Sequence, residues 1–204
     1  MEDTYDIVVI GGGPAGEVAA DRTVRSGLTA VVIEAEAVGG ECSYRACVPG
    51  KALLRPGAAR AEARSVEGAR QAVTAELDPA HVLARRDRFT RCGDDTGQAD
   101  WLDGAGIALV RGHVRLAGER RVEVTGADGA VRTLRAWHAV VVCTGAEPAL
   151  PSVEGIDGIG VDQPAGHHSR CGARSACRHR RGSGGLRDGP RVELARLLRH
   201  SAGP

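Results

Sequence analysis

The first third of the chain alternates between short apolar runs and a segment of helical character. Residues 6–10 and 30–33 are β-branched and apolar, a pattern that predicts buried parallel strands. Residues 17–26 between them carry apolar side chains at helical spacing, and Gly27 is expected to end that helix. The order strand, helix, strand within about 30 residues predicts a βαβ unit.

The middle of the chain is expected to leave this sheet. Residues 52–91 are rich in Ala and Arg and predict mostly helix, with Pro56, Gly68 and Pro79 as interruptions. Trp101 and Leu102 are expected in a core, just before a turn.

The chain then returns to β-structure. Residues 107–110 predict a strand, and the alternating runs 121–124 and 131–134 flank a glycine turn, which indicates a hairpin. Residues 139–148 predict another buried strand ending in Thr-Gly. The fold class is therefore α/β, a Rossmann-like parallel sheet with a β-meander insertion.

Residues 161–204 have a different character. They hold nine Arg, four His and seven Gly, but only three acidic residues and six Val or Leu. A disordered basic tail, a nucleic-acid arm and a zinc site are each compatible with this composition. The zinc candidates have no standard spacing: His167, His168, Cys171, Cys177 and His179.

Composition narrows the class of protein. The length of 204 residues suits one to two domains, and a net charge of +1 argues against nucleic acid or an anionic membrane as main partner. The acidic start lacks the features of a signal peptide, and no run reaches the roughly 18 apolar residues of a membrane span. A cytoplasmic location is expected, where paired cysteines are more often catalytic or metal-binding than structural.

A glycine fingerprint lies between the first predicted strand and helix. Gly11, Gly13 and Gly16 fit G-x-G-x-x-G, with Pro14 and Ala15 inside the motif. Such glycines allow a tight turn, close approach of a pyrophosphate, and close packing of helix on strand. An acid at the end of the second strand, here Glu34, can accept hydrogen bonds from a ribose hydroxyl. The alternative is a glycine-rich turn in an ordinary βαβ unit.

Two cysteines five positions apart follow a glycine pair at residues 39–40. Cys42 and Cys47 are expected to open the next helix, where the helix dipole favours thiolate. Lys51, four residues later, is the single lysine of the chain. These features indicate a redox disulfide, and buried structural cysteines or a zinc pair are the alternatives.

Residues 1–60 resemble the class I pyridine nucleotide-disulfide oxidoreductases, which include dihydrolipoamide dehydrogenase, glutathione reductase and mercuric reductase. Their pattern G-G-T-C-x-N-x-G-C-x-P-S-K here reads G-G-E-C-S-Y-R-A-C-V-P-G-K over residues 39–51, with Glu41, Tyr44, Ala46 and Gly50 as departures.

The resemblance implies FAD as cofactor and a role for each residue of the motif. Cys42 would be the interchange thiol, Cys47 the charge-transfer thiol, and Lys51 would lie near the flavin. The expected cofactor-binding residues are Gly11, Gly13, Pro14, Ala15, Gly16, Glu34, Gly40, Glu41, Cys42, Lys51, Val114, Thr144 and Gly145. No metal site is expected.

The same resemblance predicts a second glycine fingerprint for NAD(P)H after residue 160, and the sequence has none. Reading residues 161–204 one base forward is compatible with the missing motif. We therefore predict an FAD domain with its redox disulfide at residues 1–160 and an out-of-frame tail at residues 161–204, the frame being lost near Gly160.

The functional expectation follows from this division. The intact parent would pass electrons from NAD(P)H through FAD to the Cys42–Cys47 disulfide and on to a small-molecule or disulfide acceptor. It would be a homodimer. The chain as written is expected to be inactive. A self-sufficient FAD module with a regulatory basic tail and a non-redox dinucleotide-binding protein are the alternatives.

Overall fold

A computed structural model describes residues 3–146, which form two compact units. The sheet unit comprises residues 3–43 and 94–146, and the helical unit comprises residues 44–93. The expected βαβ start is confirmed: β1 (Asp3–Ile10), α1 (Pro14–Arg25) and β2 (Ala30–Glu34) follow one another, and β1 and β2 are parallel with Ile7 opposite Ala30.

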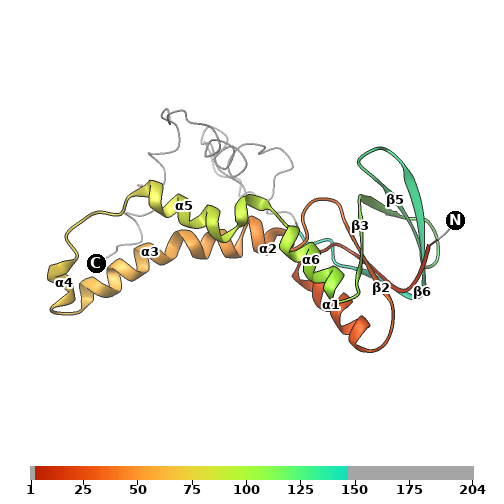
Figure 1. Cartoon of the computed structure of the whole chain (residues 1–204), viewed down its shortest axis with the longest axis horizontal. Helices are drawn as coiled ribbons and strands as arrows, with labels where there is room; N and C mark the ends of the chain where they lie inside the picture. Colours follow the sequence, from red (N-terminus) through yellow and green to blue (C-terminus); the bar gives the residue numbers. More distant parts are fainter. Residues whose placement is uncertain (1–2, 147–204) are drawn as a thin grey trace, which may run out of the picture. The chain divides into compact units, whose positions relative to one another are not determined.

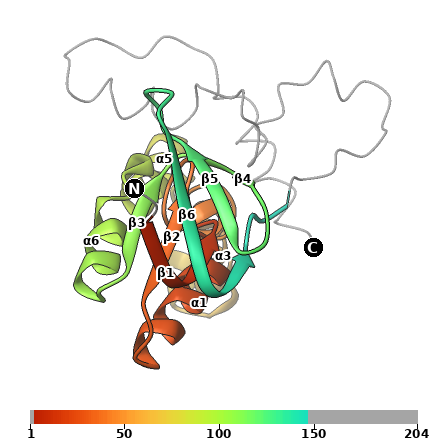
Figure 2. The same cartoon turned by 90° about the vertical axis from the view of Figure 1, so that its right-hand side faces the viewer.

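Six strands form one mixed sheet in the order β3-β2-β1-β6-β5-β4. The parallel part contains β3 (Ala108–Arg111), β2, β1 and the end of β6 (Val131–Val142). The antiparallel part is the meander of β4 (His113–Leu116), β5 (Arg121–Thr125) and the start of β6. Figure 2 shows β6 as the long strand that forms a hairpin with β5. The predicted hairpin and meander are therefore confirmed.

The central parallel strands β1 and β2 are buried on both faces. Val9 and Val32 pack with α1 and with α6 (Thr96–Gly104), whereas Val8 and Val31 pack with the meander. Successive side chains of a strand point to opposite faces, so a strand covered on both sides has to be apolar at every position. This is why β1 and β2 read as continuous runs of Val and Ile in the sequence.

The helical unit contains two long helices. The helix α3 (Cys47–Ser65) packs along α5 (Pro79–Phe89), as Figure 1 shows, and the short α4 (Ala69–Ala72) lies between them in the chain. Asp78 caps α5 by accepting a hydrogen bond of 2.9 Å from the Ala80 amide. A 3-10 turn, η1 (Arg91–Gly93), ends the unit.

Four predictions about the elements are wrong. Pro56 does not interrupt the helix, because α3 runs through it, supported by Ala- and Arg-rich sequence and by packing on α5. Trp101 is 43% exposed, because the adjacent Leu102 takes the one face of α6 that meets the sheet.

The other two concern β6. Residues 131–134 and 139–142 are one strand, because the chain stays extended while it passes from β5 to β1. Its end is not buried: Val142 is 61% exposed, since β1 lies on one side only and no strand of the described residues pairs with the other side.

Within residues 3–146, no helix is both long and apolar enough to cross a bilayer. The predictions made for residues 161–204 lie outside the described residues.

Candidate functional site

The glycine loop joins the end of β1 to the start of α1. The Gly11 amide donates a hydrogen bond of 2.8 Å to the carbonyl of Ile33 at the end of β2. A Cβ atom on Gly16 would lie only 1.9 Å from the carbonyl oxygen of Gly11. A side chain at position 16 would therefore push α1 off the strand, and this is the close helix–strand packing that the fingerprint predicts.

The first turn of α1 is open to a ligand. Gly13 is the N-cap and contributes no capping side chain, and Pro14 and Ala15 are exposed. A Cβ on Gly13 would meet only the Cα of Gly40, at 4.0 Å. The first amides of a helix have no intrahelical acceptor, and a phosphate is a suitable one. The loop therefore fits the pyrophosphate of a dinucleotide.

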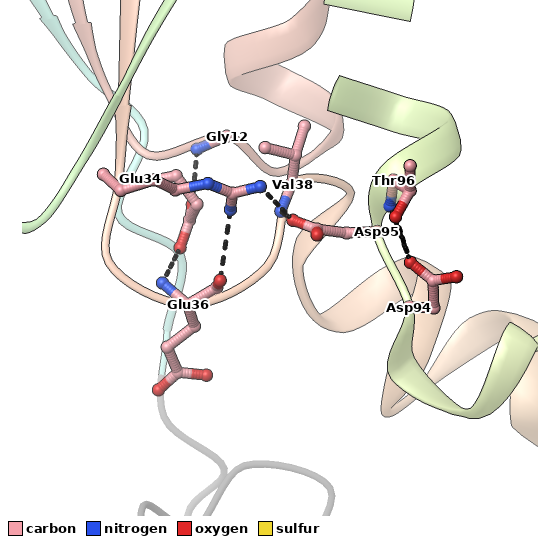
Figure 3. Close-up of polar contacts among 8 residues, drawn as sticks. Gly12, Glu34, Glu36, Val38, Asp94, Asp95 and Thr96 are labelled. Carbon is pink, nitrogen blue, oxygen red and sulfur yellow. Dashed lines mark hydrogen bonds and ion pairs between the residues drawn. The ribbon is translucent and has the colours of Figure 1, made fainter. Parts of the chain in front are cut away.

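Glu34 lies at the end of β2 beside this loop. Its Oε2 accepts a hydrogen bond of 2.7 Å from the Gly12 amide, and its Oε1 accepts one of 2.8 Å from the Glu36 amide (Figure 3). A carboxylate offers about four lone-pair sites, so these two bonds leave capacity for ribose hydroxyls. The sequence predicted the acid at this position, and the structure shows that the backbone orients it.

A second glycine pair meets the first loop backbone to backbone. The Gly39 amide donates a hydrogen bond of 2.7 Å to the carbonyl of Gly12, and a Cβ on Gly40 would lie 2.9 Å from the Cα of Gly13. Gly40 begins the short helix α2 (Gly40–Tyr44). Glu41 and Cys42 follow in α2, one and two residues beyond the contact with the glycine loop.

The segment after β6 closes the loop from the other side. The Cys143 amide donates a hydrogen bond of 2.7 Å to the carbonyl of Ile10, and a Cβ on Gly11 would lie 3.3 Å from the Cα of Thr144. Gly145 follows, exposed and with φ +76°. Thr144 therefore lies beside the fingerprint, and Gly145 is the next residue of the chain.

Val114 is placed differently from these residues. It lies in β4, opposite Val124, and packs on the core cluster of the meander face.

The two cysteines do not open one helix. Cys42 is partly buried in α2, Cys47 is the exposed first residue of α3, and both are thiols. The residue before α3, Ala46, has φ −119° and ψ −82°, which breaks the helical path between them. Lys51 is exposed in α3, so Cys47 and Lys51 belong to the helical unit and Cys42 to the sheet unit.

One acid near the loop has a shifted pKa. Burial raises the pKa of Glu17, in the first turn of α1, above its usual value. The positive end of the helix favours a carboxylate at this place, but the loss of hydration outweighs it.

Four further residues join the site without having been predicted individually. Gly39 donates a hydrogen bond to the carbonyl of Gly12, whose own amide donates to Glu34, and Asp95 and Arg111 hold the loop after β2. The G-G pairs were visible signals for the first two. Nothing in the sequence predicts the contacts of Asp95 and Arg111 with this loop, because they cross 57 and 75 residues of chain.

The fold and this loop define a Rossmann-type dinucleotide-binding domain. Residues 5–181 match the family model described as pyridine nucleotide-disulphide oxidoreductase. The chain belongs to this family.

Relatives of known name agree with the family match. The chain is 38% identical over 157 residues to dihydrolipoyl dehydrogenase 3 of Pseudomonas aeruginosa, covering 75% of this chain and 33% of that protein. It is 29% identical over 158 residues to the mercuric reductase of Lysinibacillus sphaericus, covering 76% and 28%. The chain thus spans about a third of the length of the curated relatives it matches.

Solved structures show the same fold. The flavoprotein disulfide reductase RclA from Escherichia coli superposes with a TM-score of 0.60 at 19% identity, over 77% of this chain and 32% of that one. LpdA from Mycobacterium tuberculosis superposes with a TM-score of 0.58 at 24% identity, over 73% of this chain and 33% of that one.

Proposed function

We propose that this chain is the FAD-binding portion of a flavin-dependent disulfide oxidoreductase. The observation that carries the proposal is the contact of the two glycine segments, in which Gly39 donates to Gly12 and Gly40 lies against Gly13. It joins the dinucleotide loop to the helix that carries Cys42. A dinucleotide-binding protein without redox chemistry has no need of a thiol at that position.

Different residues of the sheet unit bind different parts of FAD. The first turn of α1, from Gly13, receives the pyrophosphate on its amides. Glu34 accepts hydrogen bonds from the adenosine ribose, and Thr144, followed by Gly145, borders the loop after the end of β6. When bound, FAD supplies the capacity to accept a hydride and to pass on two electrons.

The thiol pair provides the second redox couple. A Cys42–Cys47 disulfide that takes up two electrons and two protons gives the two thiols seen in this structure. In this pair Cys42 is proposed as the interchange thiol and Cys47 as the charge-transfer thiol, and Lys51 supplies a positive charge one turn further along α3. The acceptor is proposed to be a disulfide or another small molecule.

We further propose that the chain is incomplete as an enzyme. The end of β6 pairs with β1 on one side, and no strand of residues 3–146 pairs with its other side. Such an edge has unpaired backbone groups with which a further strand can pair. The coverage of about one third of each relative supports the same proposal.

The tail is proposed to be an out-of-frame reading of the NAD(P)H-binding domain, with the frame lost near Gly160. The family match continues to residue 181, so the position of the border has to come from DNA. Resequencing the codons for residues 155–170 tests it directly. A gene that, read one base forward, encodes no second glycine fingerprint would refute this part of the proposal.

The cofactor assignment is tested on the purified full chain with FAD, FMN and NAD(P)H. We expect FAD to bind through its adenosine end, FMN to bind far more weakly because it lacks that end, and NAD(P)H to produce no turnover. Glu34→Ala should weaken FAD binding at least about tenfold, the value of one hydrogen bond to a charged group. Sustained NAD(P)H oxidation by the chain would contradict its proposed incompleteness.

The thiol assignment needs its own comparison. Oxidation with a diamide reagent should remove two titratable thiols from the wild type, because Cys42 and Cys47 form a disulfide. In Cys47→Ser the Cys42 thiol has lost this partner and should remain titratable. Cys143→Ser is the matched control, because Cys143 packs against the core. If Cys47→Ser leaves the disulfide count of the oxidised chain unchanged, the redox pair is not Cys42 and Cys47.

A further inference from the structure

The loop between β2 and α2, residues 35–39, is held by an aspartate from a distant part of the chain. Oδ2 of Asp95, the residue before α6, accepts a hydrogen bond of 2.7 Å from the Val38 amide (Figure 3). Val38 is fully buried, and the Asp95 side chain is 21% exposed. A charge-assisted bond in this partly dry position is stronger than one on the open surface.

An arginine completes the arrangement. Nη2 of Arg111, at the end of β3, lies 2.6 Å from the same Oδ2 of Asp95, and its Nη1 donates 3.2 Å to the carbonyl of Glu36. The guanidinium is planar and presents several donors at once, so one side chain can hold both the carboxylate and the backbone. We call the Asp95–Arg111 pair the clamp.

The clamp holds the loop by hydrogen bonds to the Glu36 carbonyl and the Val38 amide, on either side of Ala37. The amides on the outer sides of these two points make contacts in the site: the Glu36 amide donates to the Glu34 carboxylate, and the Gly39 amide donates to the Gly12 carbonyl. The Gly112 amide also bonds the carbonyl of Glu34, at 3.0 Å. The start of α6 and the end of β3 therefore fix the part of the loop that decides where Glu34 points.

We propose that Asp95 and Arg111 are positioning residues for the adenosine end of the cofactor site. They hold residues 35–39 so that the Glu34 carboxylate and the Gly39–Gly40 segment are set before the cofactor arrives, which saves the ordering cost of a free loop on binding. The identity of the ligand as FAD rests on the proposed function; the holding of the loop does not.

The expected effects follow from the two contacts. Asp95→Ala removes both the acceptor of the Val38 amide and the partner of Arg111. Asp95→Asn keeps an acceptor for Val38 and loses the charge, so its effect should be smaller. Arg111→Lys has one ammonium in place of a fork and can serve either Asp95 or the Glu36 carbonyl, but not both.

The experiment uses the full chain and two readouts. Peptide-resolved hydrogen exchange over residues 34–40 should accelerate about tenfold in Asp95→Ala and less in Asp95→Asn. Dissociation constants for FAD and for ADP should rise together, by about tenfold in Asp95→Ala, because both ligands carry the adenosine end. Asp100→Ala, an exposed aspartate of the same helix, is the control and should change neither readout.

Each outcome decides something. Unchanged exchange over residues 34–40 in Asp95→Ala overturns the clamp, whether or not FAD binds. Faster exchange with unchanged dissociation constants overturns its role in the site. A lower melting midpoint in Asp95→Ala with equal affinity marks a purely structural residue. If the wild type binds neither FAD nor ADP, the proposed function fails, while the exchange data still decide the clamp.

Discussion

Gly40 touches Gly13: a Cβ on Gly40 would lie 2.9 Å from the Cα of Gly13, closer than folded chains allow. The contact brings the loop that precedes Cys42 directly against the loop that opens α1. Position 40 has to be glycine because the Gly13 backbone occupies the space where its side chain would be, whereas a Cβ on Gly13 would meet the Gly40 Cα only at 4.0 Å.

Gly40→Ala should therefore be costly for two reasons, the clash and a φ of +56°. We expect a loss of about 2–4 kcal/mol in the free energy of unfolding, measured in urea. Gly27→Ala is the matched control, with φ +81° and nothing within 4 Å of the added Cβ. It should cost only the backbone strain, about 1 kcal/mol. Equal losses in the two variants would mean that the loops can separate.

Gly50→Ala should stabilise the chain. Gly50 lies in the first turns of α3, and an added Cβ would meet nothing within 4 Å. Alanine loses less backbone entropy on folding than glycine, so the gain should be about 0.5–1 kcal/mol in the free energy of urea unfolding. A destabilised variant would show that the chain places another group against this turn.

Asp6→Asn should destabilise the chain at neutral pH and lose this effect in acid. The amide and the hydroxyl of Thr29 donate hydrogen bonds of 2.8 and 2.7 Å to Oδ2 of Asp6. These bonds hold the pKa of Asp6 below its usual value. A depressed pKa gives stability above the unfolded value, about 4, that is lost as the pH falls through the folded value.

The measurement for Asp6 is the melting midpoint of wild type and Asp6→Asn between pH 3 and 7. The two curves should converge toward the acid end. A constant gap across this range would show that the loss comes from geometry and not from ionisation.

Glu17→Gln should stabilise the chain at high pH, whereas Asp6→Asn destabilises it at neutral pH. Burial raises the pKa of Glu17, so its ionisation above that pKa costs stability that the neutral amide does not lose. We expect the variant to melt a few degrees higher than wild type at pH 8 and equally at pH 4. A variant that is less stable at pH 8 would show that the charge on Glu17 is compensated by a neighbouring group.

The strands and the glycine loop could be predicted from the sequence because their signals are local. A strand covered on both faces needs an apolar residue at every position, and β1 and β2 show this directly. The failed predictions concern elements whose limits depend on a neighbour. The helix α3 passes Pro56 while packed on α5, and β6 is continuous because it changes partner from β5 to β1.

The sequence by itself determined the kind of site: a G-x-G-x-x-G loop after a buried strand, an acid at the end of the next strand, and two thiols after a second glycine pair. Only the tertiary structure decided how that site is held. Asp95 reaches Val38 across 57 residues, and Arg111 reaches Glu36 across 75. Contacts of this range depend on where α6 and β3 pack against the sheet, and packing leaves no period or spacing in the sequence from which they could have been read.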